Sequence, residues 1–362
     1  GRHLLPGIID DQVHFREPGL THKGDFYTES RAAIAGGITS YMEMPNSNPT
    51  TTDAMQLKWK YARAAQTSAA NYAFYFGATN DNIEDIRALD PAATCGVKIF
   101  MGASTGNMLV DKQETLDGIF REAPALIATH CESTPMIMAN TRDALKKYGK
   151  KIPVTEHARI RSAEACLASS ELAVGLANKY QAQLHVLHIS TARELDLFKP
   201  GPMAGKDITA EACVHFLHFD DSQYAGLGNR IKCNPAIKGA TDRDALIQAV
   251  ADGRLDIIAT DHAPHTAEEK ASEDYLTAPS GLPLVQDVVL SVLELVHDNQ
   301  LDLHTVVRGI THNPAERFSV VDRGYIREGY FADLVLVDMN GVTEATPERV
   351  LSRCGWTPFE GQ

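Results

Sequence analysis

Residues 256–265 read DIIATDHAPH, and the interpretation of the rest of the chain starts from this stretch. Its first half is a short apolar run with β-branched side chains, which is typical of a strand buried on both faces. The run then gives way to Asp261, His262 and His265. On its own, such a stretch fits a capped strand end with a solvated turn as well as it fits a functional site. The functional interpretation is favoured because four other apolar runs of this chain carry a histidine or a lysine at or near their ends.

Strand-like and helix-like segments alternate along the chain without a low-complexity linker. The apolar runs predict eight strands, at residues 4–15, 38–44, 72–78, 97–101, 126–129, 184–189, 208–214 and 256–259. Helical patterns fall between and after them, at residues 25–35, 53–69, 132–147, 162–180, 284–297 and 302–309. Strands joined by helical crossovers pair in parallel, and eight of them close a barrel. The sequence therefore predicts the α/β fold class, as a (β/α)8 TIM barrel over residues 1–320.

The C-terminal segment, residues 321–362, has a different texture. Residues 325–337 (YIREGYFADLVLV) combine a turn, a glycine and a strand that passes from alternating to apolar. We expect this segment to form part of a small β-sandwich appendage. The chain starts at Gly1 without a methionine, so we also expect a missing N-terminal part that completes the appendage.

Net charge and cysteine content indicate which partners and which compartment the protein is suited to. The 362 residues carry a formal net charge of -13, which argues against a nucleic-acid partner because a phosphate backbone needs a basic face. The six cysteines include no CxxC pair, which is typical of reduced cysteines in a cytoplasmic protein. No apolar run is long enough to span a membrane, and no signal-like start is present. We expect a cytoplasmic protein with a small-molecule ligand, and the sequence leaves a homo-oligomer open.

The candidate metal ligands fall at the ends of the predicted strands. His14 closes the first strand, His130 the fifth and His188 the sixth, while Lys98 lies in the fourth and Asp261 follows the eighth. In a (β/α)8 barrel these strand ends share one mouth, where catalytic residues gather. A single histidine at a strand end is more often a hydrogen-bonded turn residue than a ligand. Convergence of three imidazoles and a carboxylate instead predicts a zinc site.

Lys98 is the unusual member of this set. It stands among apolar neighbours in the run GVKIFM, residues 96–101, where a charged side chain is costly. The commoner outcome is a lysine that reaches solvent or forms an ion pair. A desolvated lysine, however, is readily neutral and therefore nucleophilic. It could react with carbon dioxide to give a carbamate, an anionic ligand able to bridge two metal ions.

The motifs of the chain resemble those of the dihydroorotases, a group of cyclic amidohydrolases in the amidohydrolase superfamily. The matching stretches are PGIIDDQVHFREPG (6–19), MEMPNSNPTT (42–51), GVKIFMGASTGNM (96–108), THCE (129–132), LHIST (187–191), TAEACVHFL (209–217), NPAIK (234–238), TDHAPH (260–265) and WTPFEG (356–361). They cover nearly the whole chain. Hydantoinases and allantoinases are similar in the lysine strand and the metal ligands but not in the full set.

The resemblance implies a barrel with one or two zinc ions bridged by N6-carboxylated Lys98. His130 and His188 would hold the more buried zinc, and His14 with Asp261 the more exposed one. The implied reaction is the reversible cyclisation of N-carbamoyl-L-aspartate to L-dihydroorotate in pyrimidine biosynthesis. In the hydrolytic direction, hydroxide attacks the ring amide with the help of the metal, and Asp261 acts as general base and acid.

The resemblance also assigns the substrate side of the site. Arg16, Asn46 and His265 correspond to residues that bind the substrate's carboxylate, and Asn234 lines the same pocket. The physical chemistry agrees for Arg16, because a guanidinium presents a planar fork suited to a carboxylate.

One position departs from the family pattern. The first strand of dihydroorotases reads His-x-His, and this chain reads Gln12-Val13-His14. Side chains two apart on a strand face the same side, so Gln12 also points at the predicted metal. Because an amide oxygen is a poor zinc ligand beside an imidazole, we expect Gln12 to complete the exposed metal site weakly and that site to be partly filled.

Two alternatives stay open. One is a hydantoinase or allantoinase type of cyclic amidase, which the carboxylate-binding set Arg16, Asn46 and His265 disfavours. The other is an inactive, dihydroorotase-like scaffold protein, which the retained metal ligands disfavour. The remaining histidines, His185, His218, His297 and His304, are interpreted as structural or surface residues.

Overall fold

The structure is a computed structural model, and it describes residues 2–102 and 108–362. Its parallel strands are β2 (Ile8–Val13), β3 (Ile38–Glu43), β4 (Asn71–Phe74), β5 (Phe76–Gly77), β6 (Val97–Phe100), β7 (Ile127–His130), β8 (Leu184–Val186), β9 (Ile208–Cys213) and β10 (Ile257–Ala259). They pair in the order β2-β3-β4 and β5-β6-β7-β8-β9-β10, and β4 and β5 are one strand interrupted at Tyr75. The backbone N–H of His14 donates to His262 O at 2.7 Å, which joins the end of β2 to that of β10. The predicted eight-stranded barrel is therefore confirmed.

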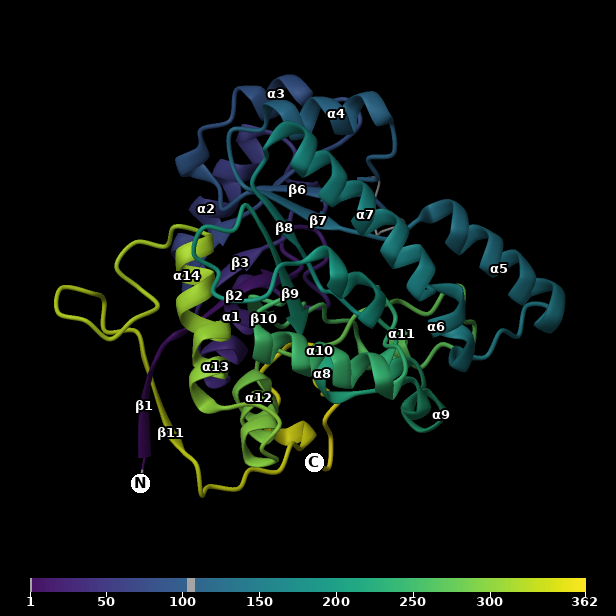
Figure 1. The fold of residues 1–362 in the computed structure, drawn as a ribbon. Helices are drawn as coiled ribbons and strands as arrows, with labels where there is room; N and C mark the ends of the chain where they lie inside the picture. The colour runs from purple at the N-terminus through teal and green to yellow at the C-terminus, as the bar shows by residue number, and fades with distance from the viewer. Residues whose placement is uncertain (1, 103–107) are drawn as a thin grey trace.

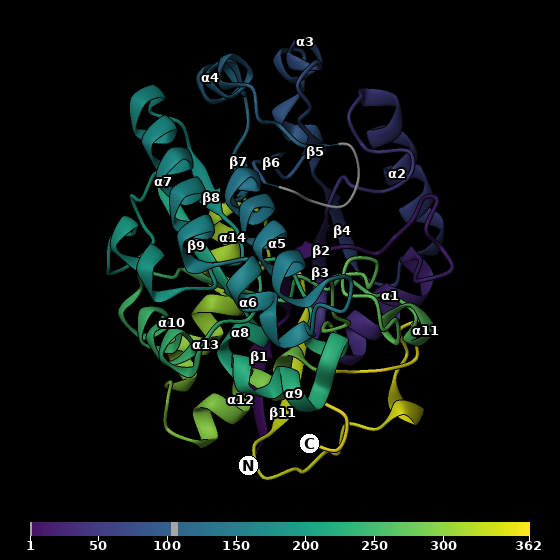
Figure 2. The same cartoon turned by 90° about the vertical axis from the view of Figure 1, so that its right-hand side faces the viewer.

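Helices surround the strands (Figure 2). They are α1 (Phe26–Ala35), α2 (Ala54–Thr67), α3 (Ile83–Arg87), α4 (Gln113–Glu122), α5 (Thr134–Tyr148), α6 (His157–Ile160), α7 (Ala163–Tyr180), α8 (Val214–His218), α9 (Tyr224–Leu227), α10 (Ala240–Asp252), α11 (Ala267–Lys270), α12 (Val288–His297), α13 (Leu303–Val307) and α14 (Asn313–Arg317). Side-chain caps begin two of the longer ones, α2 and α7: Asp53 accepts from Gln56 N, and Ser162 accepts from Ala165 N. Among the described residues, no helix has the length and apolar character that crossing a membrane requires.

The first predicted strand, residues 4–15, is wrong as a single element. The structure divides it at Gly7 into β1 (Arg2–Pro6), which leaves the barrel, and β2, which enters it. Gly7 N donates to Asp333 O at 2.7 Å, so the chain is held to the C-terminal segment at the division. A side chain at Gly7 would approach Thr39 Oγ1 to 2.1 Å, and only glycine allows this close passage.

The appendage is a two-stranded antiparallel sheet of β1 and β11 (Leu334–Asp338), which lie side by side away from the barrel (Figure 1). Its β11 strand falls inside the predicted segment. The chain then returns to the barrel, because Trp356 Nε1 donates to His265 O at 2.7 Å and Ser352 Oγ to Glu29 Oε2 at 2.6 Å. A barrel with a separate antiparallel sheet is therefore confirmed, while a domain boundary at residue 320 stays a prediction.

The interior of the barrel is filled from the end opposite the predicted site. Ile9, Met42, Tyr75 and Ala315 form a buried cluster against which Phe318 packs. Tyr75 also donates its hydroxyl to the carbonyl of Asp11 at 3.0 Å. The barrel is thus a packed core at this end, and the predicted site residues lie toward the carboxyl ends of the strands.

Candidate metal centre at the barrel mouth

One cavity at the carboxyl ends of the strands gathers nine of the ten predicted site residues. Its lining includes Gln12, His14, Arg16, Asn46, Lys98, His130, His188, Asn234 and Asp261. The tenth, His265, lies behind Arg16, with its Nε2 3.2 Å from Arg16 Nη2. Of the matching stretch 96–108, residues 103–107 lie outside the described part of the chain. Residues from six separate strand ends are thus brought to one place.

The backbone at three of these positions is unusual. Arg16 has a φ of 70°, His188 of 43° and Asp261 of 51°. Side chains other than glycine rarely adopt positive φ, and such strain is concentrated at functional sites. At each of the three positions the chain leaves a strand while its side chain lines the cavity.

The inner half of the site, which we define as His130, His188 and Lys98, is arranged to bind a metal. His130 Nδ1 lies 3.0 Å from His188 Nε2, so two imidazole nitrogens face one point. Burial lowers the pKa of both rings, which keeps them in the neutral form that ligates metals. His130 Nε2 lies 3.1 Å from Glu132 Oε2, and Glu132 is ion-paired with Arg161. A carboxylate beside Nε2 favours the tautomer with its proton on Nε2, which leaves the Nδ1 lone pair of His130 free for a metal.

Lys98 contributes an unusual nitrogen to this half. Its side chain is 1% exposed, and Nζ has no hydrogen-bond partner among the described residues. Burial lowers its pKa to about 8, although the negative charges of Asp261 and Glu211 oppose that shift. A buried, unpartnered amine that is readily neutral fits the carbamate chemistry expected from the sequence. The donor set of the inner half therefore fits a zinc ion.

The outer half, which we define as His14, Asp261 and Gln12, has a different arrangement. His14 Nδ1 donates to Asn46 Oδ1 at 2.8 Å, and its Nε2 lies 3.2 Å from Asp261 Oδ1. Asn46 thus orients a predicted ligand, a role that the sequence does not indicate. Gln12 donates from Nε2 to the same Asp261 oxygen at 3.0 Å. The amide nitrogen of Gln12, not its oxygen, is therefore the atom next to Asp261.

The substrate side combines cations with an uncharged imidazole. Arg16 is 6% exposed and donates from Nε to Pro264 O at 3.0 Å. Burial lowers the pKa of Arg16 to about 10, so the group stays charged at neutral pH. His265 Nε2 lies 3.0 Å from Ser280 O, and its Nδ1 lies 2.9 Å from Lys23 Nζ. Burial and then the charges of Arg16 and Lys23 lower the pKa of His265, so this ring is neutral.

A second group of ionisable side chains lies one layer below the cavity. Among the described residues, it is the group of His, Cys, Asp and Glu whose ligand atoms all fall within 4.8 Å of one another, and its members are Asp11, His185 and Glu211. His185 Nε2 lies 3.1 Å from an oxygen of each carboxylate. Burial lowers the pKa of His185, but the two carboxylates outweigh it and raise the value to about 9. The charged ring offsets part of the negative charge, and burial and then the charge of Asp11 raise the pKa of Glu211 well above its ordinary value. Glu211 Oε1 also accepts from His188 N at 3.0 Å, which supports the metal ligand above.

Sequence reasoning missed several of these supporting residues. His185 lies at 0% exposure between two carboxylates, so it is no surface residue, and a structural role for it stays a prediction. Glu132, Lys23 and Glu211 stand inside or beside the matching motifs, yet their spacing carries no signal because their partners come from distant strands and loops. Of the other histidines interpreted as structural or surface residues, His297 and His304 are exposed and His218 is half-buried.

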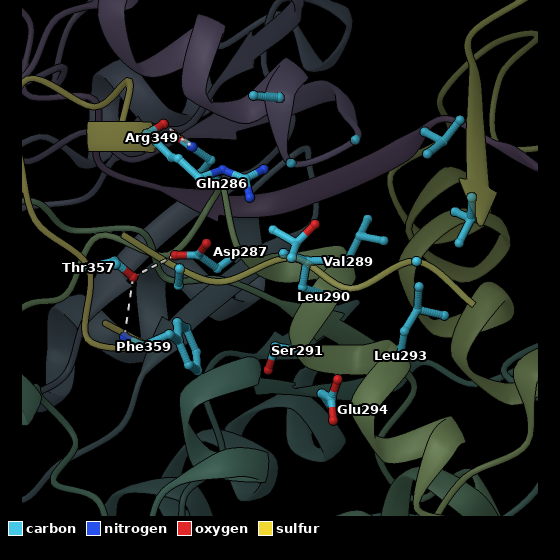
Figure 3. Close-up of a pocket in the computed structure, with 18 of the residues that line it drawn as sticks. Gln286, Asp287, Val289, Leu290, Ser291, Leu293, Glu294, Arg349, Thr357 and Phe359 are labelled. Carbon is cyan, nitrogen blue, oxygen red and sulfur yellow. Dashed lines mark hydrogen bonds between the residues drawn. The ribbon is translucent and has the colours of Figure 1, made fainter. Parts of the chain in front are cut away.

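A larger hollow lies elsewhere, between α12, β11 and the returning C-terminal segment (Figure 3). Apolar side chains of α12, including Val289, Leu290 and Leu293, line it, and Asp287 accepts from Thr357 Oγ1 at 2.6 Å. None of the ten predicted site residues borders it. Function is assigned to the barrel mouth because the buried imidazoles and Lys98 converge there.

Comparison with known proteins shows the family to which the chain belongs. The sequence profile of the Amidohydrolase family matches residues 3–354. The chain is 34% identical over 360 residues to a dihydroorotase of Halobacterium salinarum, covering 99% of this chain and 82% of that protein. It is 31% identical over 367 residues to an allantoinase of Solibacter usitatus, covering 100% and 80%. Among solved structures, L-hydantoinase (dihydropyrimidinase) from Arthrobacter aurescens superposes with a TM-score of 0.93 at 25% identity, covering 100% of this chain and 82% of that one.

Proposed function

The chain belongs to the amidohydrolase family and is a hydrolase of cyclic amides, and we propose that its substrate is L-dihydroorotate. In this proposal the enzyme works in the cytoplasm and interconverts dihydroorotate and N-carbamoyl-L-aspartate. The full set of motifs and the similarity to curated dihydroorotases support the choice. The allantoinase and hydantoinase relatives make the related cyclic amidases the second candidates.

The observation that carries the proposal is that Arg16 is buried and charged in the cavity without an ion-pair partner among the described residues. Its guanidinium lines the cavity at 6% exposure, and within the described residues its polar contacts are Pro264 O and His265 Nε2, with no carboxylate at ion-pair distance. Asp261 and Glu43 stabilise the charge of Arg16 from a distance, but a buried charge without a direct ion pair is unfavourable. A ring substrate with its own carboxylate supplies that counter-charge, and a plain hydantoin or allantoin ring does not. Arg16 with neutral His265 beside it is thus suited to hold a carboxylated ring.

Different residues at the barrel mouth would bind the metal and transfer the proton. His130, His188 and carboxylated Lys98 would hold a zinc ion, with His14 and Asp261 on its outer side. Zinc held there would polarise the ring carbonyl and acidify the attacking water. Asp261 takes the proton of that water and passes it to the leaving ring nitrogen, and the same two transfers in reverse close the ring.

Other residues would position the substrate ring next to Asp261. Arg16 holds the substrate's carboxylate from one side, and its bond to Pro264 O ties it to the loop that carries Asp261. We assign Asn46 and Asn234 to the same pocket. The Oδ1 atom of Asn234 is buried without a hydrogen-bond partner among the described residues, so it can accept from a ring N–H.

A substrate panel tests the proposal. Purified protein with zinc and bicarbonate is assayed for hydrolysis of dihydroorotate, hydantoin and allantoin, and for ring closure of N-carbamoyl-L-aspartate. We expect kcat/KM to be highest for dihydroorotate. Faster turnover of hydantoin or allantoin would contradict the substrate assignment. Absence of all turnover in metal-loaded protein would favour the scaffold alternative. Sedimentation of the same sample tests whether the protein is a homo-oligomer.

A further inference from the structure

Gln12 is a buried amide in contact with the predicted catalytic carboxylate. Its side chain is 1% exposed, and Nε2 donates to Asp261 Oδ1 at 3.0 Å. His14 Nε2 lies 3.2 Å from the same oxygen. The outer half of the site therefore holds one imidazole and one carboxylate, with an N–H donor in the third position.

The surroundings of Gln12 determine which end of its amide faces the site. Cys213 Sγ lies 3.8 Å from Gln12 Oε1 and 3.7 Å from Glu211 Oε1. A thiol carries one S–H proton and is a weak donor, so the oxygen of the amide, and not its N–H group, suits the side that faces Cys213. The amide oxygen thus faces a donor. The opposite orientation would place that oxygen against the Asp261 carboxylate, where two acceptors repel each other.

The two halves of the site consequently differ in their capacity for a metal. The inner half offers the two imidazole nitrogens of His130 and His188, 3.0 Å apart, together with the unpartnered Nζ of Lys98. The outer half offers His14 and an Asp261 oxygen that already accepts the Gln12 N–H. Zinc prefers imidazole nitrogen and carboxylate oxygen, and an amide N–H offers it no lone pair.

We propose that Gln12 is a positioning residue that holds Asp261 by a hydrogen bond in place of an outer metal ion, so that the enzyme works with one tightly bound metal. This inference rests on the proposed function for the role of Asp261 in proton transfer. The metal count itself needs no assumption about the substrate. An outer cation would hold the Asp261 carboxylate in a fixed orientation. The Gln12 amide does this instead, because its hydrogen bond fixes the oxygen that accepts the proton.

Metal analysis tests the count. Full-length protein is loaded with zinc and bicarbonate, dialysed against a mild chelator and analysed by mass spectrometry. We expect one zinc per chain, rising toward two in Gln12→His. Gln66→His, at an exposed position of α2, is the matched control for adventitious binding by an added imidazole and should stay at one. Two tightly held zinc ions in the unmodified protein would overturn the inference.

Kinetics and diffraction test the positioning role. Gln12→Met keeps the length of the side chain but removes the N–H donor, so kcat for dihydroorotate should fall about 10- to 100-fold with KM little changed. Zinc content should remain at one per chain. An unchanged kcat would overturn the positioning role. If Gln12→Met does not fold, anomalous scattering at the zinc edge from crystals of the unmodified protein measures the occupancy of both halves of the site. Equal peaks in the two halves would contradict the inference.

A protein that holds one zinc but does not hydrolyse dihydroorotate would refute the proposed function and leave the single-metal inference standing.

Discussion

Arg16→Met separates recognition of the substrate's carboxylate from support of the active-site loop. The change removes the guanidinium but keeps an apolar stem of similar length. Arg16 makes two kinds of contact: it donates to Pro264 O within the protein, and it faces the cavity where a carboxylated ring would lie. A substrate without a carboxylate is affected only through the contact with Pro264 O. Comparison of substrates with and without a carboxylate therefore isolates the contribution of Arg16 to carboxylate binding.

The size of the effect follows from the burial of Arg16. At 6% exposure, the guanidinium and a bound carboxylate would be a largely desolvated charge pair. Loss of one partner of such a pair costs about 2–5 kcal/mol. This corresponds to a decrease in kcat/KM of roughly 30-fold to several thousand-fold. Most of the decrease should fall on KM, because the carboxylate is held in the ground state and the transition state alike.

The assay measures kcat/KM of both proteins for dihydroorotate and for dihydrouracil, the same ring without a carboxylate. We expect the large decrease for dihydroorotate alone. Arg63→Met is the control, because Arg63 pairs with Glu17 at 2.6 Å and does not line the cavity. An equal loss for both rings would show that Arg16 only supports the loop, and the argument for a carboxylated substrate would then fail.

Three further predictions concern other parts of the site. Lys98→Ala should lose zinc and turnover together, and density for a carboxyl group on Nζ is expected in the unmodified protein; a loaded and active variant would disprove the ligand role. Asp261→Ala should lower kcat by about 10²- to 10⁴-fold with an unchanged circular dichroism spectrum, as loss of a general acid and base requires. His185 has a folded-state pKa raised to about 9 from an ordinary value near 6.5, so its contribution to stability is complete below the lower value and is lost as pH rises through the higher one. At most about 3 kcal/mol is involved, and the melting temperature of the unmodified protein should fall between pH 7 and 10 more steeply than that of His185→Gln.

The sequence predicted the barrel because its information is local and repeated. Buried parallel strands require continuous apolar runs, such as 97–101 and 256–259, and these are visible without knowledge of their neighbours. The topology then brings strand ends together, so His14, His130, His188 and Asp261 could be placed at one mouth before any distance was known. The departure at Gln12 was also visible, because residues two apart on a strand share a face.

Tertiary structure alone decided how these side chains meet. The division of residues 4–15 depends on Gly7 passing close to Thr39, a contact between separate strands. The cluster of Asp11, His185 and Glu211 joins three strands with no common spacing. The orientation of the Gln12 amide depends on a thiol from β9, some 200 residues away along the chain. Local patterns determine which segments form strands, whereas hydrogen-bond direction and charge balance depend on atoms that only folding brings within a few ångströms.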